Sequence, residues 1–110
     1  MKTDAFKRWL EAQGQAPASV STRSSGASRV EQRLGDLEEL FAREGLDAVL
    51  GRFAYSTEDE REGRPNPSPV PIDGVLRTGL ASIQQSLKLY HRFLTERTTM
   101  PDKDAHLALL

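Results

Sequence analysis

The chain has 110 residues, of which 37% are hydrophobic and 28% charged, and its formal net charge is −1. This length fits one domain, and because cysteine is absent, disulfide frameworks, thiolate metal sites and cysteine nucleophiles are excluded. The sequence contains neither the roughly 18 to 20 consecutive apolar residues of a membrane span nor a signal peptide, so we expect a cytoplasmic protein without a membrane partner.

Basic residues outnumber acidic ones at both ends of the chain. Residues 1–33 contain six basic and three acidic residues, residues 34–71 contain four and nine, and residues 72–110 contain five and four. The acidic middle therefore separates two basic ends, which a helical fold can bring side by side.

The first predicted helix is short and amphipathic. Phe6, Trp9 and Leu10 share its inner face, and Gly14 ends it. Because these are the strongest apolar residues near the N-terminus, we expect Trp9 to be substantially buried between the first and last helices.

A second helical segment follows Pro17 and is rich in serine. Its narrow apolar stripe consists of Val20, Ala27, Val30 and Leu34. Gly26 lies inside this helix, where glycine costs about 1 kcal/mol relative to alanine. We therefore expect either that packing against a neighbour stabilises this segment or that Gly26 lets another backbone or a phosphate approach closely, and both require a close neighbour at Gly26.

Two further short helices are predicted in the acidic middle of the chain. Asp36 caps a helix that ends near Gly45, and residues 46–53 have helical spacing. Ser56 then begins a turn in which Asp59 occupies the partner position of a capping box.

Four prolines at alternate positions predict an extended strap over residues 65–71. Val70 and Ile72 are its apolar anchors, so we expect the strap to be ordered against the bundle. Its proline spacing differs from that of SH3-type ligands.

The longest predicted helix runs from Asp73, its cap, to Arg97, with Pro101 just beyond its end. Its apolar face repeats at three- and four-residue steps and consists of Leu76, Leu80, Ile83, Leu87, Tyr90, Phe93 and Leu94. This face belongs in the core of the protein.

Two lines of polar and basic residues are candidates for binding an anionic partner. One lies on the serine-rich helix and contains Thr22, Gly26, Arg29 and Arg33, flanked by Arg23; the other lies on the long helix and contains Arg77, Gln84, Lys88 and Arg92. Hydroxyls and arginines beside a glycine suit phosphate oxygens. The alternative interpretation is that both lines merely solvate exposed helix faces.

Motifs of catalysis are missing. The sequence has no glycine-rich phosphate loop and no Gly-x-Ser-x-Gly, and neither of its two histidines, His91 and His106, has a partner at a metal-binding spacing. We therefore expect no catalytic residues, no cofactor and no metal, and an isolated domain that is not an enzyme.

Two runs of residues resemble one helical family. The first contains Phe6, Trp9, Leu10, Gly14, the pentapeptide Ser19–Arg23, Val30, Leu34 and Gly35–Leu37. It resembles the opening of the SAM-like core-binding domain at the N-terminus of tyrosine recombinases and phage integrases. The second contains Tyr55–Arg61, Pro65–Pro67, Ile72–Gly74, Leu76, Arg77, Gly79 and Leu80. It resembles a version of this domain fused to bacterial nuclease or restriction-type proteins.

The resemblance implies a helical fold and a DNA clamp in which Arg23, Arg29, Arg33, Arg77 and Lys88 contact phosphates. The chain departs from the integrase pattern at Gly26, where such domains often carry an aromatic residue, and in its acidic insert and proline strap. The catalytic residues of recombinases belong to a separate C-terminal domain, so neither Tyr55 nor Tyr90 inherits a nucleophile role.

These observations predict an all-α, SAM-like bundle of four to five helices over residues 1–97, with the proline-rich strap before the long C-terminal helix. Residues 98–110 form a tail or the start of a following element, and their apolar end suggests a covalently linked further domain.

We expect a non-catalytic DNA-binding module of a larger DNA-processing protein, which grips the duplex backbone with a basic helical face. The predicted contacts are Thr22, Arg23, Arg29, Arg33, Arg77, Gln84, Lys88 and Arg92. The alternative is a protein-interaction or oligomerisation module. The two basic lines must share one surface for the first function, whereas an extensive exposed apolar patch would favour the second.

Overall fold

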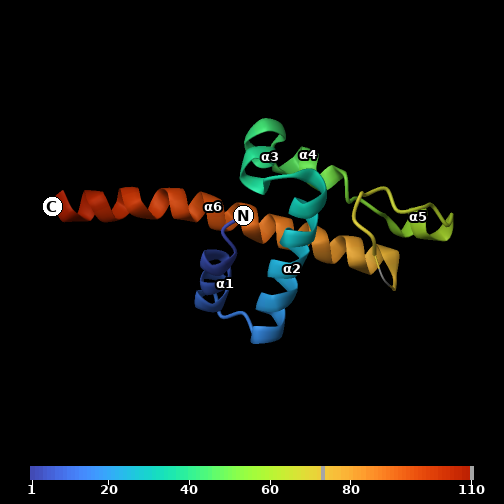
Figure 1. The fold of residues 1–110 in the computed structure, drawn as a ribbon, viewed down its shortest axis with the longest axis horizontal. Helices are drawn as coiled ribbons and strands as arrows, with labels where there is room; N and C mark the ends of the chain where they lie inside the picture. The colour runs from blue at the N-terminus through green and yellow to red at the C-terminus, as the bar shows by residue number, and fades with distance from the viewer. Residues whose placement is uncertain (73, 110) are drawn as a thin grey trace.

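The computed structural model describes residues 1–72 and 74–109, with side chains described up to Glu96. The described chain is all-helical, as predicted, but contains six helices rather than four or five. They are α1 (Thr3–Ala12), α2 (Pro17–Leu34), α3 (Leu37–Glu44), α4 (Leu46–Gly51), α5 (Thr57–Arg61) and α6 (Leu76–Leu109). The five shorter helices pack around the N-terminal part of α6, and the C-terminal part of α6 projects from the bundle (Figure 1).

The bounds of α6 differ from the prediction at its C-terminal end. The helix passes through Pro101 and continues to Leu109, so the predicted end near Arg97 is wrong. A proline inside a helix removes one backbone hydrogen bond, and the many residues on either side of it can still propagate the helix. The predicted cap, Asp73, lies outside the described residues. Within those residues, no helix is long and apolar enough to cross a membrane.

The apolar face of α6 forms the centre of the core, as its spacing predicts. Phe6 and Leu10 of α1 are fully buried, and the Phe6 ring contacts Tyr90 edge-on, with their centroids 5.0 Å apart. Trp9 lies between α1 and α6 as expected, but it is half-buried at the rim. Its indole N–H donates to Glu96 over 2.7 Å.

The most extensive contact between two helices is the crossing of α2 over α6 (Figure 1). Gly26 lies so close to Ser86 that a Cβ atom added at Gly26 would be 2.5 Å from the serine Oγ and 3.0 Å from its Cβ. The expectation that Gly26 needs a close neighbour is therefore confirmed, and that neighbour is another helix.

The capping signals at Asp36 and Ser56 behave as the sequence predicts. The Asp36 side chain accepts a hydrogen bond from the Glu38 backbone N–H at the start of α3. Ser56 and Asp59 form a reciprocal capping box at the start of α5. The hydrogen bond from the Ser56 backbone N–H lowers the pKa of the Asp59 carboxyl.

The proline strap is anchored to the bundle at the two expected residues. Val70 is buried in the core, and a Cβ atom added at Gly79 of α6 would lie 2.4 Å from Cγ2 of Ile72. The Asn66 side chain donates to the Val70 carbonyl over 2.7 Å and accepts from the Ser68 backbone N–H. These contacts hold the strap against the beginning of α6.

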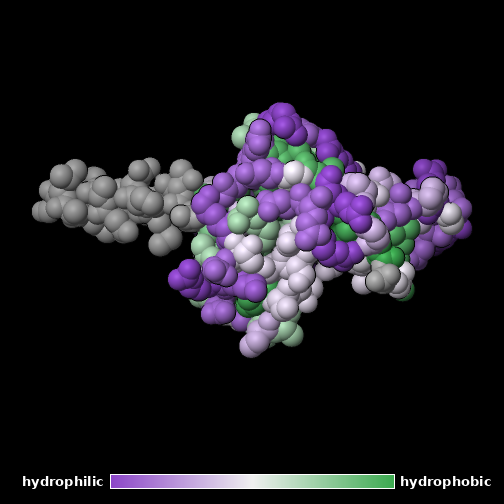
Figure 2. Space-filling model, viewed as in Figure 1, coloured by the Kyte–Doolittle hydropathy of each residue, from purple (hydrophilic) through white to green (hydrophobic). Residues whose placement is uncertain are grey.

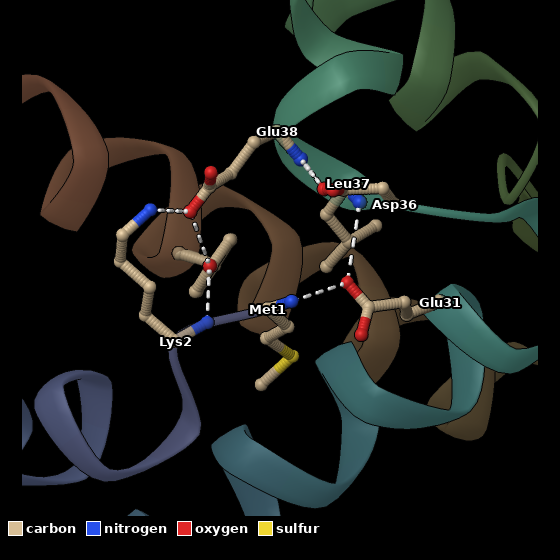
Figure 3. Close-up of polar contacts among 7 residues, drawn as sticks. Met1, Lys2, Glu31, Asp36, Leu37 and Glu38 are labelled. Atoms are coloured by element: carbon tan, nitrogen blue, oxygen red, sulfur yellow. Dashed lines mark hydrogen bonds and ion pairs between the residues drawn. The ribbon is translucent and has the colours of Figure 1, made fainter.

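A network of polar contacts joins the start of the chain to α2, α3 and α6 (Figure 3). The Met1 amino group lies 3.0 Å from a carboxylate oxygen of Glu31, and the Lys2 ammonium pairs with Glu38. The buried Tyr90 hydroxyl accepts from the Lys2 backbone N–H over 2.9 Å and donates to Glu38 over 3.2 Å. Burial raises the pKa of Tyr90 to about 12, so this phenol is a donor within the core.

Candidate nucleic-acid interface

The outer face of α2 is a largely exposed surface of hydroxyls with one amide and one cation. We call it the α2 ridge, and it consists of Ser21, Thr22, Ser25, Ser28, Arg29 and Gln32. The ridge follows from the helical repeat, because Val20, Ala27 and Val30 turn the opposite side of α2 into the core. In Figure 2 much of the surface along α2 is pale, since serine and threonine lie near the middle of the hydropathy scale.

A groove of about 380 Å³ separates the α2 ridge from α1. We call it the α1–α2 groove. Thr3 and Lys7 of α1 form one wall, and Ser24, Ser28 and Gln32 contribute to the other. Among the described residues that line this groove, Lys7 and Arg29 are cations and none is acidic.

A second groove, of about 340 Å³, lies on the other side of the ridge, where α2 meets the strap and the first turns of α6. We call it the α2–α6 groove. Its walls include Thr22 and Arg29 from α2, Ile72 from the strap, and Gly79 and Ser82 from α6. Its described lining also contains a cation but no carboxylate, so both sides of the ridge suit an anion rather than a cation.

The candidate residues on α2 have different environments. Arg23 turns inward, and its guanidinium donates to the Ser82 carbonyl of α6 over 2.8 Å. Arg29 stays exposed and donates to the Pro71 carbonyl of the strap, while the Thr22 hydroxyl donates to the Ala18 carbonyl over 3.0 Å. Arg33 is exposed and has no polar partner among the described residues.

The candidate residues on α6 mostly have protein partners. Arg77 lies 3.3 Å from a Glu60 carboxylate oxygen of α5, and Gln84 donates to the Leu50 carbonyl of α4 over 3.1 Å. Arg92 lies 3.3 Å from a Glu96 carboxylate oxygen, and its guanidinium carbon is 5.7 Å from the centre of the Trp9 ring.

Lys88 is the exception on this helix. It is exposed, and it has no polar partner in the described part of the chain. Lys88 and Arg33 are therefore the two candidate cations that the described protein leaves without a hydrogen bond or ion pair.

The two predicted basic lines do not share one surface. Ser82 and Ser86 of α6 face α2, as their contacts with Arg23 and Gly26 show. Residues two positions apart on a helix point about 160° apart, so Gln84 and Lys88 point away from α2. Arg77 likewise stands two positions from Gly79, which lines the α2–α6 groove.

Arg92 is also separated from the ridge. It lies against Trp9, and Trp9 points about 160° away from Lys7 because the two are two positions apart on α1. The structure therefore brings together Thr22, Arg29 and Arg33 along one side of α2, and it places the α6 line elsewhere.

Sequence reasoning missed Lys7 and Ser24 as candidate site residues. The helical repeat predicts only that Lys7 lies on the exposed face of the first helix, and Ser24 belongs to neither basic line. Serines at positions 21, 24, 25 and 28 share one side of α2. That clustering is the signal that could have directed attention to the α1–α2 groove.

Comparison of the chain with protein-family models, with curated proteins and with solved structures gives no match. The resemblance to the core-binding domain of recombinases therefore remains a hypothesis.

Proposed function

We propose that this chain is a non-catalytic module that binds the backbone of duplex DNA with the α2 ridge and its two flanking grooves, within a larger DNA-processing protein. The observation that carries the proposal is the composition of these grooves. Their described linings combine hydroxyls with Lys7 and Arg29 and include no carboxylate, in a chain whose net charge is −1.

Phosphate oxygens match this surface chemically. Serine and threonine hydroxyls donate hydrogen bonds to them, and an arginine can donate two parallel bonds to one phosphate group. The exposed Arg33 continues the same side of α2 and adds a charge that no described residue neutralises. An approaching DNA backbone would therefore meet hydrogen-bond donors, and no carboxylate in the described groove linings would repel its phosphates.

Backbone contact should dominate over reading of base edges. Base readout in the major groove typically uses several Asn, Gln and Arg side chains that project together from one helix. The exposed ridge offers Arg29 and Gln32 among mostly short hydroxyl side chains. We therefore expect weak binding with little sequence preference.

The rival function, a protein-interaction module, depends on an extensive apolar patch. Among the described side chains, Val75 is the large hydrophobic residue that is exposed, with 60% of its surface accessible. One such residue at the beginning of α6 is normal for a protein surface. The observations on the described surface thus favour the polar ridge as the site.

Binding can be measured by fluorescence anisotropy with a short labelled duplex at several salt concentrations. We expect a dissociation constant on the order of 10⁻⁴ to 10⁻⁶ M at moderate salt and an affinity that falls steeply as salt is added, because bound phosphates release counterions. Absence of binding at low salt, or binding that is insensitive to salt, would overturn the proposal.

A further inference from the structure

Ser24 is a buried residue whose hydroxyl has no partner among the described residues. Its residue exposure is 3%, yet its Oγ makes no hydrogen bond with any described residue. Every fully enclosed side-chain nitrogen or oxygen in the described chain has a partner. The Ser24 Oγ must therefore reach the surface of the α1–α2 groove, which Ser24 lines.

Ser86 shows how a buried serine is normally satisfied in this fold. It is fully buried, and its Oγ donates to the Ser82 carbonyl one turn earlier over 3.2 Å. Ser24 also lies within a helix, so the Val20 carbonyl stands at the equivalent position, but no such bond forms. Because the Ser24 Oγ lies at the surface of the groove, its hydrogen bond is left to solvent or to a ligand in the groove.

Lys7 supplies a positive charge at the same groove. It is exposed and has no ion pair with a described residue, whereas Arg29, the groove's other cation, donates to the strap carbonyl of Pro71. The acidic residues of α1, Asp4 and Glu11, do not line the groove. A hydroxyl donor, a free ammonium and the absence of carboxylates in the described lining together select an oxyanion.

We propose that the α1–α2 groove is a site for a single phosphate group, in which the Ser24 hydroxyl donates a hydrogen bond to a phosphate oxygen and Lys7 neutralises its charge. Ser28 and Gln32, which line the same wall, can donate further bonds. This inference rests on the proposed function in identifying the phosphate as part of a nucleic-acid backbone. The groove, of about 380 Å³, has room for a phosphate together with part of its sugar.

The test uses the 110-residue chain and two matched pairs of variants. Lys7→Gln is compared with Lys88→Gln, which removes an equal charge from the side of α6 that faces away from α2. Ser24→Ala is compared with Ser86→Ala, which removes a buried hydroxyl that already has a partner. The probes are a short labelled duplex, followed by anisotropy, and inorganic phosphate, followed by backbone amide shifts in NMR spectra.

We expect Ser24→Ala to weaken duplex binding roughly threefold to tenfold, the effect of one lost hydrogen bond, without loss of thermal stability. Lys7→Gln should lower the salt slope by about one unit. Neither effect should appear in Lys88→Gln or Ser86→Ala. Inorganic phosphate should shift the amides of Ser24 and Ser28 in the unmodified chain and should shift them less in Ser24→Ala.

The outcomes separate the two proposals. If all four variants bound the duplex as tightly as the unmodified chain does, the groove would not be a phosphate site, and the proposed function would stand. Phosphate-induced shifts at the groove without duplex binding would support the site, with a phosphate from another source, and overturn the proposed function. Neither duplex binding nor phosphate shifts would overturn both.

Discussion

The α2 ridge and the far side of α6 carry cations in different surroundings. On the far side, Arg77 lies beside the Glu60 carboxylate of α5, and Arg92 lies beside Glu96 and over Trp9, whereas Lys88 has no polar partner among the described residues. Beside the ridge, Lys7 has no ion pair with a described residue, and Arg29 donates to a neutral carbonyl. The partners that a cation meets in the fold, rather than its place in a helical repeat, decide whether it is available to a ligand.

The acidic middle of the chain explains the asymmetry. Helix α5 contains three acidic residues in its first turn, and it packs against α6 beside Arg77. The ridge is bordered instead by α1 and by the strap. The strap contributes prolines, a buried valine and backbone carbonyls. Among the described residues that line the two grooves beside the ridge, none is a carboxylate.

Charge reversal should produce the largest effect. Arg29→Glu with Arg33→Glu should weaken duplex binding beyond the order of 10⁻⁴ M, the weak end of non-specific affinity, because two phosphate contacts become repulsive. Anisotropy with the labelled duplex would measure this loss.

The matched control for that reversal lies on the far side of α6. Arg77→Glu with Lys88→Glu changes the net charge equally and also combines one partnered and one unpartnered cation. Retained binding in this control would confirm the distinction between the two faces. Equal loss in both double variants would show that only total charge matters.

A bulky residue at Gly26 should disrupt the close packing of α2 against α6 beneath the ridge. Because a Cβ atom there already meets Ser86 at 2.5 Å, Gly26→Val should lower the free energy of unfolding by roughly 3 kcal/mol through overpacking. Urea denaturation would measure the change. Ser25→Val, on the exposed ridge one residue earlier, should change stability by only about 0.5 kcal/mol; similar losses in both variants would contradict the tight crossing.

Tyr90 offers a change in stability that should be independent of both surfaces. The pKa of Tyr90 in the folded protein is about 12, above the usual value of 10.0. The contribution of the neutral phenol to the free energy of unfolding is therefore fully present below pH 10 and is lost as the pH rises from 10 through 12. This loss should amount to about 2 to 3 kcal/mol. Urea denaturation across this pH range should show that the free energies of unfolding of the unmodified chain and of Tyr90→Phe converge. Duplex binding near neutral pH should be the same in both. Parallel pH curves would contradict the raised pKa.

The smallest effect is expected at the Arg77–Glu60 pair. Both side chains are more than 40% exposed, and exposed ion pairs contribute about 0 to 1 kcal/mol. Glu60→Gln should therefore leave the melting temperature nearly unchanged while it frees Arg77. If this variant gained strong duplex binding, the far side of α6 would be a latent site, and the comparison would need revision.

The local elements of this protein follow from short-range patterns in its sequence, apart from the C-terminal end of α6. Asp36 and the Ser56–Asp59 box mark helix starts with signals that lie within three residues of one another, and the stripe of α6 repeats at a fixed helical period. Val70 and Ile72 anchor the strap because they are its apolar residues. Such features depend on neighbouring residues alone, so they can be read before the fold is known.

The surfaces that the helices present depend on how the helices pack against one another. The close contact of Gly26 with Ser86 fixes which side of α6 faces α2, and that orientation turns Arg23 inward and points Lys88 away from the ridge. These outcomes depend on how two helices cross, which is set by side chains about 60 positions apart in the chain. A helical repeat specifies the side of its own helix on which a residue lies, but it does not specify the neighbour on that side.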